Sequence, residues 1–419
     1  MGYYRLLNNE QVNPREICRS LSDQCQERIE GLNVLALSDS SEVNLSRHRR
    51  RLNPEKLGVL SNNKNVGIFI HPTLVLDAED GMPLGLSDVY WWSRDPERKD
   101  KHSRQYKQQE IEEKESYKWW QVAQNSQRCW AAAKTVTYIA DREADIYELW
   151  EQTPKLQSHA LFRASRDRKI QESPQRLYSY LSQQPMAGTY AFRVRGEPRQ
   201  QRMEREAWMR VRFTPVTLYR PSRLNASDYA PTVKLYALEA VEIQPPTGQK
   251  PIHWRLLTTH LINSLEQALQ VIQWYGWRWR IEQLFAVLKQ DGLDIESTQL
   301  ESVAAIERLL VLSLGAALRI LQLCLGRDDT VRPASLVFSD AQQQCLMHLS
   351  QHWQGRTRHQ QNPFPPYSLA WATWVIARVG GWSGYRSQRP PGIALLYRGL
   401  RRFNSLFQGW SMARDSTYV

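Results

Sequence analysis

Short runs of apolar and β-branched residues, each bounded by turn-forming or charged residues, dominate the first part of the chain. Such runs are typical of β-strands. They lie at residues 33–38, 66–76, 82–92, 134–140 and 159–163. The pair Asp80 and Gly81 stands between the second and third runs and is a strong hairpin signal. We expect strands in all five runs, with the second and third paired with the first.

Other segments repeat their apolar residues with the helical period of about 3.6 residues. We expect helices within residues 113–119, 141–150, 264–292, 303–325 and 368–382, and mostly helical structure in the polar residues 1–30. Residues 167–253 instead alternate in strand fashion, with Pro and Gly breaks and a basic bias, and residues 327–365 are polar and weakly patterned. Strands followed by helices in this way predict an α/β fold with a β-rich insertion and a helical C-terminal domain.

The segment 274–292 places four polar side chains on one helical face. Tyr275, Arg278, Glu282 and Lys289 fall within an arc of roughly 60°, because each residue turns a helix by about 100°. Apolar residues such as Ile281 occupy a different arc, which can dock the helix on a core. One carboxylate therefore stands among three groups that bind phosphate. The alternative interpretation is a surface helix with solvated charges.

Two aspartates follow predicted strands directly. Asp39 ends the first apolar run, which predicts a strand that delivers a carboxylate, although Ser-Asp-Ser is also a common turn. Asp141 closes the run at 134–140 and opens a helical segment, and its alternative role is that of a helix N-cap. Asp39, Asp141 and Glu282 are far apart in the sequence, so only the fold can bring them together.

The spacing Tyr-(x2)-Arg-(x3)-Glu-(x6)-Lys at residues 275–289 resembles the signature of the insertion-sequence-four family of cut-and-paste DNA transposases. The sequence Asp-Arg-Glu-Ala-Asp-Ile at 141–146 matches the second-aspartate motif of that family. The resemblance implies a ribonuclease-H-like catalytic core in which Asp39, Asp141 and Glu282 are catalytic. These carboxylates would bind two Mg2+ or Mn2+ ions, since hard cations prefer carboxylate oxygens. Tyr275, Arg278 and Lys289 would hold DNA phosphates.

Further positions carry the resemblance less closely. Arg163 coincides with a family arginine near the active site, and Trp254 stands where such enzymes place a tryptophan that stacks on a base pulled from the duplex. The alternative for Trp254 is an ordinary core residue. Ser40 and Ser41 replace threonines that commonly follow the first aspartate, and Ala286 stands where some relatives carry a second lysine.

The resemblance also suggests a domain organisation. We expect residues 31–165 and 254–298 to form the catalytic core, 166–253 a β-rich insertion, and 299–419 a helical C-terminal domain for dimerisation or DNA contact. Family members carry a helical DNA-binding domain before the segment that resembles Tyr4-Arg-Leu-Leu-Asn-Asn. We therefore expect residues 1–30 to be the remnant of that region in an N-terminally truncated chain.

The charge of the chain favours a polyanionic partner. Lys and Arg number 55 against 43 Asp and Glu, which gives +12 at pH 7 and a pI near 9.5. Residues 355–419 hold nine Arg and one Asp, interleaved with aromatic residues. The run of His and Arg at 47–51 is an exposed loop or a phosphate contact. We expect double-stranded DNA, both transposon ends and target, as the partner, with a homodimer forming when two ends are synapsed.

Cysteines, histidines and apolar runs exclude other classes. Five cysteines without a Cys-x-x-Cys pair indicate neither a disulfide framework nor a zinc ribbon. His348, His352 and His359 lack the carboxylate of a zinc-protease motif. The longest apolar run, 309–318, is too short to span a bilayer, and no signal peptide begins the chain. We expect a cytoplasmic, nucleoid-associated bacterial protein without a membrane segment.

The expected function is metal-dependent hydrolysis and strand transfer at transposon ends. A second hypothesis is a non-catalytic regulator that dimerises with full-length transposase and inhibits it. A third is a cellular nuclease on the same fold. It is disfavoured because residues 368–382, with Ala-Arg-Val-Gly-Gly at 377–381, and Gly392-Ile393 resemble the closing segment of the transposase family.

Overall fold

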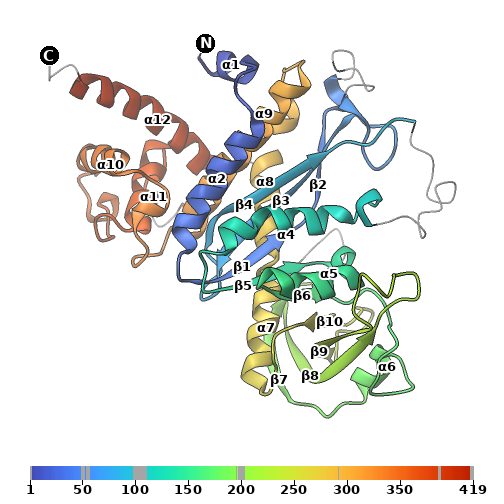
Figure 1. The fold of residues 1–419 in the computed structure, drawn as a ribbon. Helices are drawn as coiled ribbons and strands as arrows, with labels where there is room; N and C mark the ends of the chain where they lie inside the picture. The colour runs from blue at the N-terminus through green and yellow to red at the C-terminus, as the bar shows by residue number, and fades with distance from the viewer. Residues whose placement is uncertain are drawn as a thin grey trace.

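The computed structural model describes residues 2–48, 52, 57–97, 111–194, 196, 203–290, 292–385 and 388–415. Its strands form one mixed ten-stranded sheet in the order β2-β3-β1-β5-β6-β10-β9-β8-β7, with β4 paired to the other side of β3 (Figure 1). The strands are β1 (Asn33–Ser38), β2 (Ser41–Asn44), β3 (Gly67–Asp77), β4 (Pro83–Trp92), β5 (Thr135–Ala140), β6 (His159–Arg163), β7 (Gly188–Val194), β8 (Arg205–Tyr219), β9 (Thr232–Ile243) and β10 (His253–Thr258).

The central part of this sheet is the ribonuclease-H-like core. β1, β5 and β6 are parallel neighbours, and β3 and β4 continue the sheet in antiparallel fashion. All five predicted strands are therefore confirmed. The expectation that both hairpin strands pair with the first strand is wrong for β4, which pairs with β3 alone among the described strands. One edge of β3 is already occupied by β1 and β2, so β4 takes the opposite edge.

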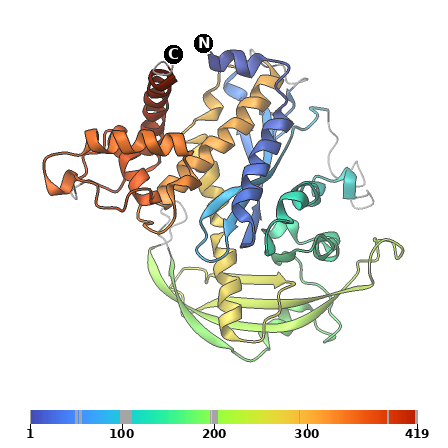
Figure 2. The same ribbon diagram turned by 60° about the vertical axis from the view of Figure 1, so that its left-hand side comes forward.

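Helices cover the sheet and build the C-terminal part (Figures 1 and 2). They are α1 (Gly2–Asn8), α2 (Pro14–Ile29), α4 (Tyr117–Trp130), α5 (Tyr147–Gln152), α6 (Leu177–Ser182), α7 (Leu265–Trp277), α8 (Trp279–Lys289), α9 (Val303–Leu325), α10 (Asp340–Trp353), α11 (Leu369–Val379) and α12 (Ile393–Asp415). α2, α4 and α9 pack on β4, and α8 packs on α9. Through α9, α8 is thereby joined to the core.

The N-terminal helices belong to the same packed unit as the sheet. Arg308 of α9 is buried and donates hydrogen bonds to the carbonyl oxygens of Leu7 and Val12, the first at 2.9 Å. Asn13 caps α2 by accepting a hydrogen bond from the backbone N–H of Arg15. The helical prediction for residues 1–30 is confirmed, while their origin in a DNA-binding domain and the predicted domain boundaries stay predictions.

The β-rich prediction for residues 167–253 also holds. β7, β8 and β9 occupy this segment, and α6, with 6 residues, is its single described α-helix. The segment joins the core sheet because β10 pairs antiparallel with both β6 and β9. The insertion is consequently a continuation of the core sheet. Most of the basic run at 47–51 and part of the run at 193–212 lie outside the described residues.

Two predicted helices are interrupted in the structure. The segment 141–150 forms a 3-10 turn (Arg142–Ala144) and then α5, because Asp145 leaves the helical conformation. The segment 264–292 divides at Arg278 into α7 and α8, although Arg278 keeps a right-handed helical backbone. Ser264 caps α7 as predicted, since its side chain accepts a hydrogen bond from the N–H of Gln267.

The C-terminal region contains more helix than the sequence pattern indicated. α10 lies within the weakly patterned residues 327–365, and α12 was not identified as a separate helix. α9 is long and apolar enough to cross a membrane, but 61% of its most apolar window is buried inside the protein. It contacts α2, α8, α12 and β4. Its apolar character is therefore that of a core helix.

Replacing Gly85 of β4 by alanine should destabilise the contact between β4 and α2. A Cβ atom at Gly85 would lie 2.5 Å from the Cβ of Cys25 and 2.8 Å from its Cα, so the backbone of α2 has to move. We expect a loss of about 1–3 kcal/mol in the free energy of unfolding, visible as a lower melting temperature. Gly276→Ala is the control, since its Cβ meets nothing within 4 Å. Equal melting temperatures of the two variants would contradict this account.

Candidate active site

The ends of two neighbouring parallel strands bring Asp39 and Asp141 to one edge of the sheet. β1 and β5 pair with Leu37 opposite Ile139, and each aspartate lies two residues beyond its member of this pair. β1 is buried from Val34 to Ser38, and β5 from Val136 to Ala140. The apolar runs thus fix the strands in the core, and the first residues to leave the core are the carboxylates.

Buried polar side chains hold the loop that carries Asp39. The backbone N–H of Ser40 donates to Asp39 Oδ1 at 2.8 Å, and Ser40 Oγ lies 2.9 Å from His71 Nδ1. His71 is fully buried against the edge of Trp119, and burial lowers the pKa of its imidazole well below the ordinary value. A neutral ring is therefore available to Ser40. The resemblance to the family includes a histidine in this strand, which His71 matches, but nothing in the sequence indicated its contact with Ser40.

Asp141 and Asp145 of the same motif have different surroundings. Asp145 is buried and accepts hydrogen bonds from Trp150 Nε1, from the backbone N–H of Ser165 and from Arg168 Nη2. Asp141 makes no capping hydrogen bond, and 34% of its side chain is exposed. Asp145 is thus committed to the structure, whereas Asp141 keeps a carboxylate toward solvent. Asp141 precedes the 3-10 turn, but its side chain does not make the hydrogen bond of an N-cap.

The junction of α7 and α8 faces these carboxylates. Tyr275 donates its hydroxyl hydrogen to Asp141 Oδ1 at 3.0 Å, and Arg278 Nη1 lies 2.6 Å from Asp39 Oδ2. The same guanidinium lies 3.9 Å from Asp141 Oδ2 and 3.9 Å from Glu282 Oε1. The structure therefore gathers Asp39, Asp141 and Glu282 around one arginine side chain, which is 12% exposed.

The electrostatics of this cluster follow from burial and from the like charges. Burial raises the pKa of Asp39 to about 6, with smaller raising contributions from Glu282 and Asp141, although the charge of Arg278 opposes the shift. Burial and the charge of Asp141 raise the pKa of Tyr275 to about 12, so its hydroxyl stays protonated as a donor. Arg278 is the counterion that lets three carboxylates approach one another.

Lys289 and Arg163 lie close enough to this cluster for their charges to act on its residues. Burial lowers the pKa of Lys289, while the charges of Glu296, Glu42 and Glu282 act in the opposite direction. Arg163 ends β6, donates to the carbonyl oxygen of His253 at 3.2 Å, and its charge acts on Tyr275. The sequence pattern gave no indication that Glu42 and Glu296 are neighbours of Lys289. Only Glu42 had a local signal, its place three residues after Asp39.

Trp254 lies beside Tyr275, within a small aromatic cluster. Its ring is partly buried and meets Phe192 at 5.3 Å and Tyr275 at 6.0 Å between centroids, both edge to face. Packing is thus present, as the alternative interpretation expected. The ring also touches a residue whose hydroxyl reaches Asp141 directly.

The donor set suits divalent cations of the hard type, because it consists of carboxylates without cysteine or histidine. In the described part of the chain, however, no group of three His, Cys, Asp or Glu side chains is arranged to hold a metal ion. The guanidinium of Arg278 lies where the carboxylates converge. A metal ion bound by these carboxylates would have to replace Arg278 as their counterion.

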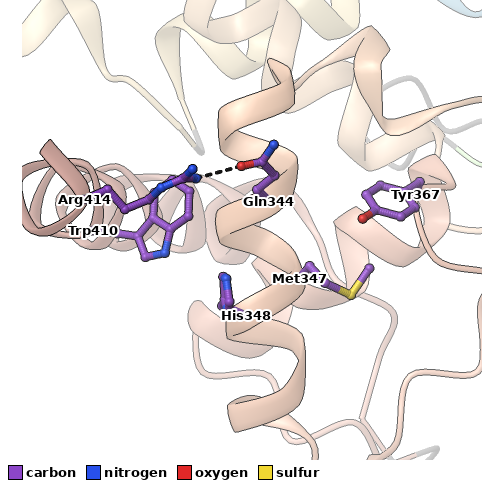
Figure 3. Close-up of a pocket in the computed structure, with 6 residues that line it drawn as sticks. All are labelled: Gln344, Met347, His348, Tyr367, Trp410 and Arg414. Carbon is purple, nitrogen blue, oxygen red and sulfur yellow. Dashed lines mark hydrogen bonds between the residues drawn. The ribbon is translucent and has the colours of Figure 1, made fainter. Parts of the chain in front are cut away.

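A separate cavity of about 390 Å3 lies between α10 and α12 (Figure 3). Arg414 Nη1 donates to Gln344 Oε1 at 2.7 Å across it, and the Arg414 guanidinium lies over the Trp410 ring. No carboxylate is among its six lining residues, so it does not offer the ligands of a hard cation. His348 lies on this cavity, and His352 bonds to the His348 carbonyl.

Comparison with sequence models of known protein families matches residues 96–319 to the family described as "Transposase DDE domain". The match covers more than half of the 419 residues. It includes Asp141 and Glu282 together with Tyr275, Arg278 and Lys289, while Asp39 precedes it.

Because the pKa of Asp39 is raised in the folded protein, the free energy of unfolding should depend on pH. The ordinary pKa of this carboxyl is 3.8, and its pKa in the folded protein is about 6. Between pH 3.8 and about pH 6, folded Asp39 therefore retains a proton that the unfolded chain releases. Stability from this group is therefore complete below pH 4 and declines as the pH rises to 6. Asp39→Asn removes the titration. We expect its melting temperature, relative to the parent, to increase by roughly 2–5 °C from pH 4 to pH 7 without metal.

Glu143→Gln is the control for this measurement, because the Glu143 side chain is 72% exposed. It should keep the parental dependence on pH. If the difference in melting temperature between Asp39→Asn and the parent stays constant from pH 4 to pH 7, the Asp39 carboxyl titrates as an exposed group.

Proposed function

The chain belongs to the family of the transposase DDE domain, and from this we propose that it is a cut-and-paste DNA transposase of the insertion-sequence-four type. The observation that carries the proposal is the convergence of Asp39, Asp141 and Glu282 on Arg278. Two of these carboxylates come from neighbouring parallel strand ends and the third from the facing helix. We assign the catalytic and metal-binding roles to all three.

Phosphodiester hydrolysis and attack by the freed 3′-hydroxyl are in-line displacements at phosphorus. When bound, two Mg2+ or Mn2+ ions about 3.5–4 Å apart would activate the entering oxygen and stabilise the leaving oxygen. Asp39 and Asp141 would hold ions from the sheet edge, and Glu282 would hold one from α8. The neutral Tyr275 hydroxyl, which donates to Asp141 Oδ1, orients that carboxylate.

The cations beside the carboxylates would position the DNA. Arg278, Lys289 and Arg163 are the phosphate-binding groups, and such contacts set the register of a duplex more than they select its sequence. Trp254 would stack on a base extruded from the duplex, as its place beside Tyr275 allows. Two chains would meet when two transposon ends are synapsed, in a bacterial cytoplasm.

Asp141→Asn should sharply reduce metal-dependent cleavage, because a neutral amide binds Mg2+ or Mn2+ more weakly than a carboxylate. The assay is a supercoiled plasmid that carries the gene of this chain with its flanking DNA, incubated with Mg2+ or Mn2+. We expect cleavage at least about a hundredfold below the parent, the lower end of the range seen when one catalytic electrostatic group is removed. Glu143→Gln, two residues along the chain and largely exposed, should cleave at the parental rate. Cleavage that survives Asp141→Asn would refute the assigned role.

Replacing Arg278 should change metal affinity in the absence of DNA. Its guanidinium lies 2.6 Å from Asp39 and competes with a cation for that carboxylate. We expect Arg278→Gln to bind Mn2+ about tenfold more tightly, equivalent to about 1.4 kcal/mol, as measured by electron paramagnetic resonance of free Mn2+.

Arg280→Gln is the matched control on the same helix, since Arg280 Nη1 bonds to Gln283 Oε1 at 3.0 Å. Its affinity for Mn2+ should equal that of the parent. If Arg278→Gln binds Mn2+ more weakly, Arg278 assembles the carboxylates for the ion and does not compete with it.

A further inference from the structure

The extension formed by β7, β8, β9 and β10 has two different faces. Ala207, Met209 and Val211 of β8 are buried and share one face, because alternate residues of a strand point the same way. α7 contacts β8 and crosses the extension, as Figure 2 shows. The residues between them in the sequence, including Trp208 and Arg210, therefore point to the opposite face.

The opposite face is covered at one end only. Toward the core, Thr214 and Val216 of β8 and Ala237 of β9 are buried on it, and α6 contacts both strands. Away from the core, Trp208 is 56% exposed and Ile243 is 36% exposed. We call the part beyond α6 the open face, and define it by Trp208, Arg210, Arg212, Glu239, His253 and Arg255. Its cations are partly exposed, with Arg212 at 16% and Arg255, whose guanidinium stacks on Tyr178 of α6, at 28%.

A buried carboxylate organises the basic residues of the open face. Glu239 is 3% exposed and accepts hydrogen bonds from His253 Nε2 at 2.7 Å, Arg255 Nε at 3.2 Å and Arg212 Nη1 at 3.3 Å. Burial acts to raise its pKa, but the His253 hydrogen bond and the charges of His253 and Arg255 lower it overall. Glu239 is thus ionised and holds the cations in fixed positions.

The positive charge of this cluster exceeds the negative charge. Two guanidiniums share the single carboxylate of Glu239, so one positive charge is left over even with a neutral His253. Arg210 lies in the next row of the sheet, opposite Val241. Within the described residues it makes no ion pair, and its buried Nε has no hydrogen-bond partner. The open face therefore presents arginines in two adjacent rows, about 7 Å apart along the strand.

We propose that the open face binds the phosphates of a duplex DNA segment without reading its sequence. Fixed arginines with surplus charge are complementary to a phosphate backbone. Trp208 and Ile243 stand opposite each other beyond the arginines and add apolar contact with sugars. The proposal rests on the proposed function and extends it.

The open face and the candidate active site bind different stretches of DNA in this arrangement. Trp254 and Arg255 are consecutive on β10, so their side chains point to opposite faces of the sheet. Arg163 pairs with Leu256 and lies on the face of Trp254. DNA on the open face is consequently separated by the sheet from DNA held at Arg163, Trp254 and Tyr275. The DNA on the open face is therefore a segment that flanks the transposon end or belongs to the target.

The test measures binding of the full chain to a 30-bp duplex without any transposon-end sequence, in EDTA, by fluorescence anisotropy over a range of salt concentrations. Each phosphate contact contributes about 0.9 to the slope of log K against log salt. We expect Arg210→Gln to lower the slope by about 1 and the affinity at least threefold, and R210Q/R255Q to lower the slope by about 2. Lys234→Gln is the matched control, because Lys234 is exposed on β9 but faces the other side.

Melting temperatures within 2 °C of the parent would establish that the variants fold. Parental affinity and slope in both arginine variants would overturn the proposal, as would an equal loss in Lys234→Gln. Tighter binding of single-stranded DNA than of duplex would also overturn it, since Trp208 would then serve as a stacking platform. Because EDTA removes divalent ions, this binding is measured whether or not the chain cleaves DNA.

Discussion

The candidate site depends first on the parallel pairing of β1 with β5. These strands lie about a hundred residues apart in the chain, and each is buried along almost its whole length. Apolar burial alone would tolerate a shift of two residues, because a strand repeats its faces every second position. The observed register places both aspartates the same distance beyond the last paired residues. Tyr275, Arg278 and Glu282 approach this edge from the two helices. His71 of β3 supports the Asp39 loop through its contact with Ser40.

The second constraint is electrostatic. Three carboxylates in a partly buried place repel one another, and each loses hydration as well. The guanidinium of Arg278 offsets this repulsion with contacts to all three. A cation held only by ionic contacts can be exchanged for another cation, whereas the apolar side of α8, built on Ile281 and Leu284, stays in the core. An exchange of this kind therefore does not require the helix that carries Arg278 to unfold.

Local sequence patterns predicted most of the core because its strands are continuous apolar runs ending in charged residues. Asp39 and Asp141 could be singled out on that ground, and Tyr275, Arg278 and Glu282 by their common helical face. The side chains around Lys289 could not be found, because Glu296 lies in another segment and reaches the site only through the fold. α10 was missed because polar residues cover most of its surface, and its apolar contacts with α11 and α12 are tertiary. The interruption after Asp141 was also missed, since two of the hydrogen-bond donors to Asp145, Ser165 and Arg168, come from residues after β6 and reach it only through the fold.

The antiparallel pairing of β6 with β10 has a consequence for how such proteins can be altered. The chain leaves the core at Arg163 and returns at Leu256, and these two residues are direct partners in the sheet. The two ends of the intervening segment therefore meet in the sheet, and Ser165 and Arg168, just inside it, hold Asp145 of the core. Loop closure costs just about 0.6 kcal/mol more for each doubling of length. Engineered versions can therefore lengthen or shorten the turns of this segment away from the core, while the strand ends that carry the carboxylates keep their places.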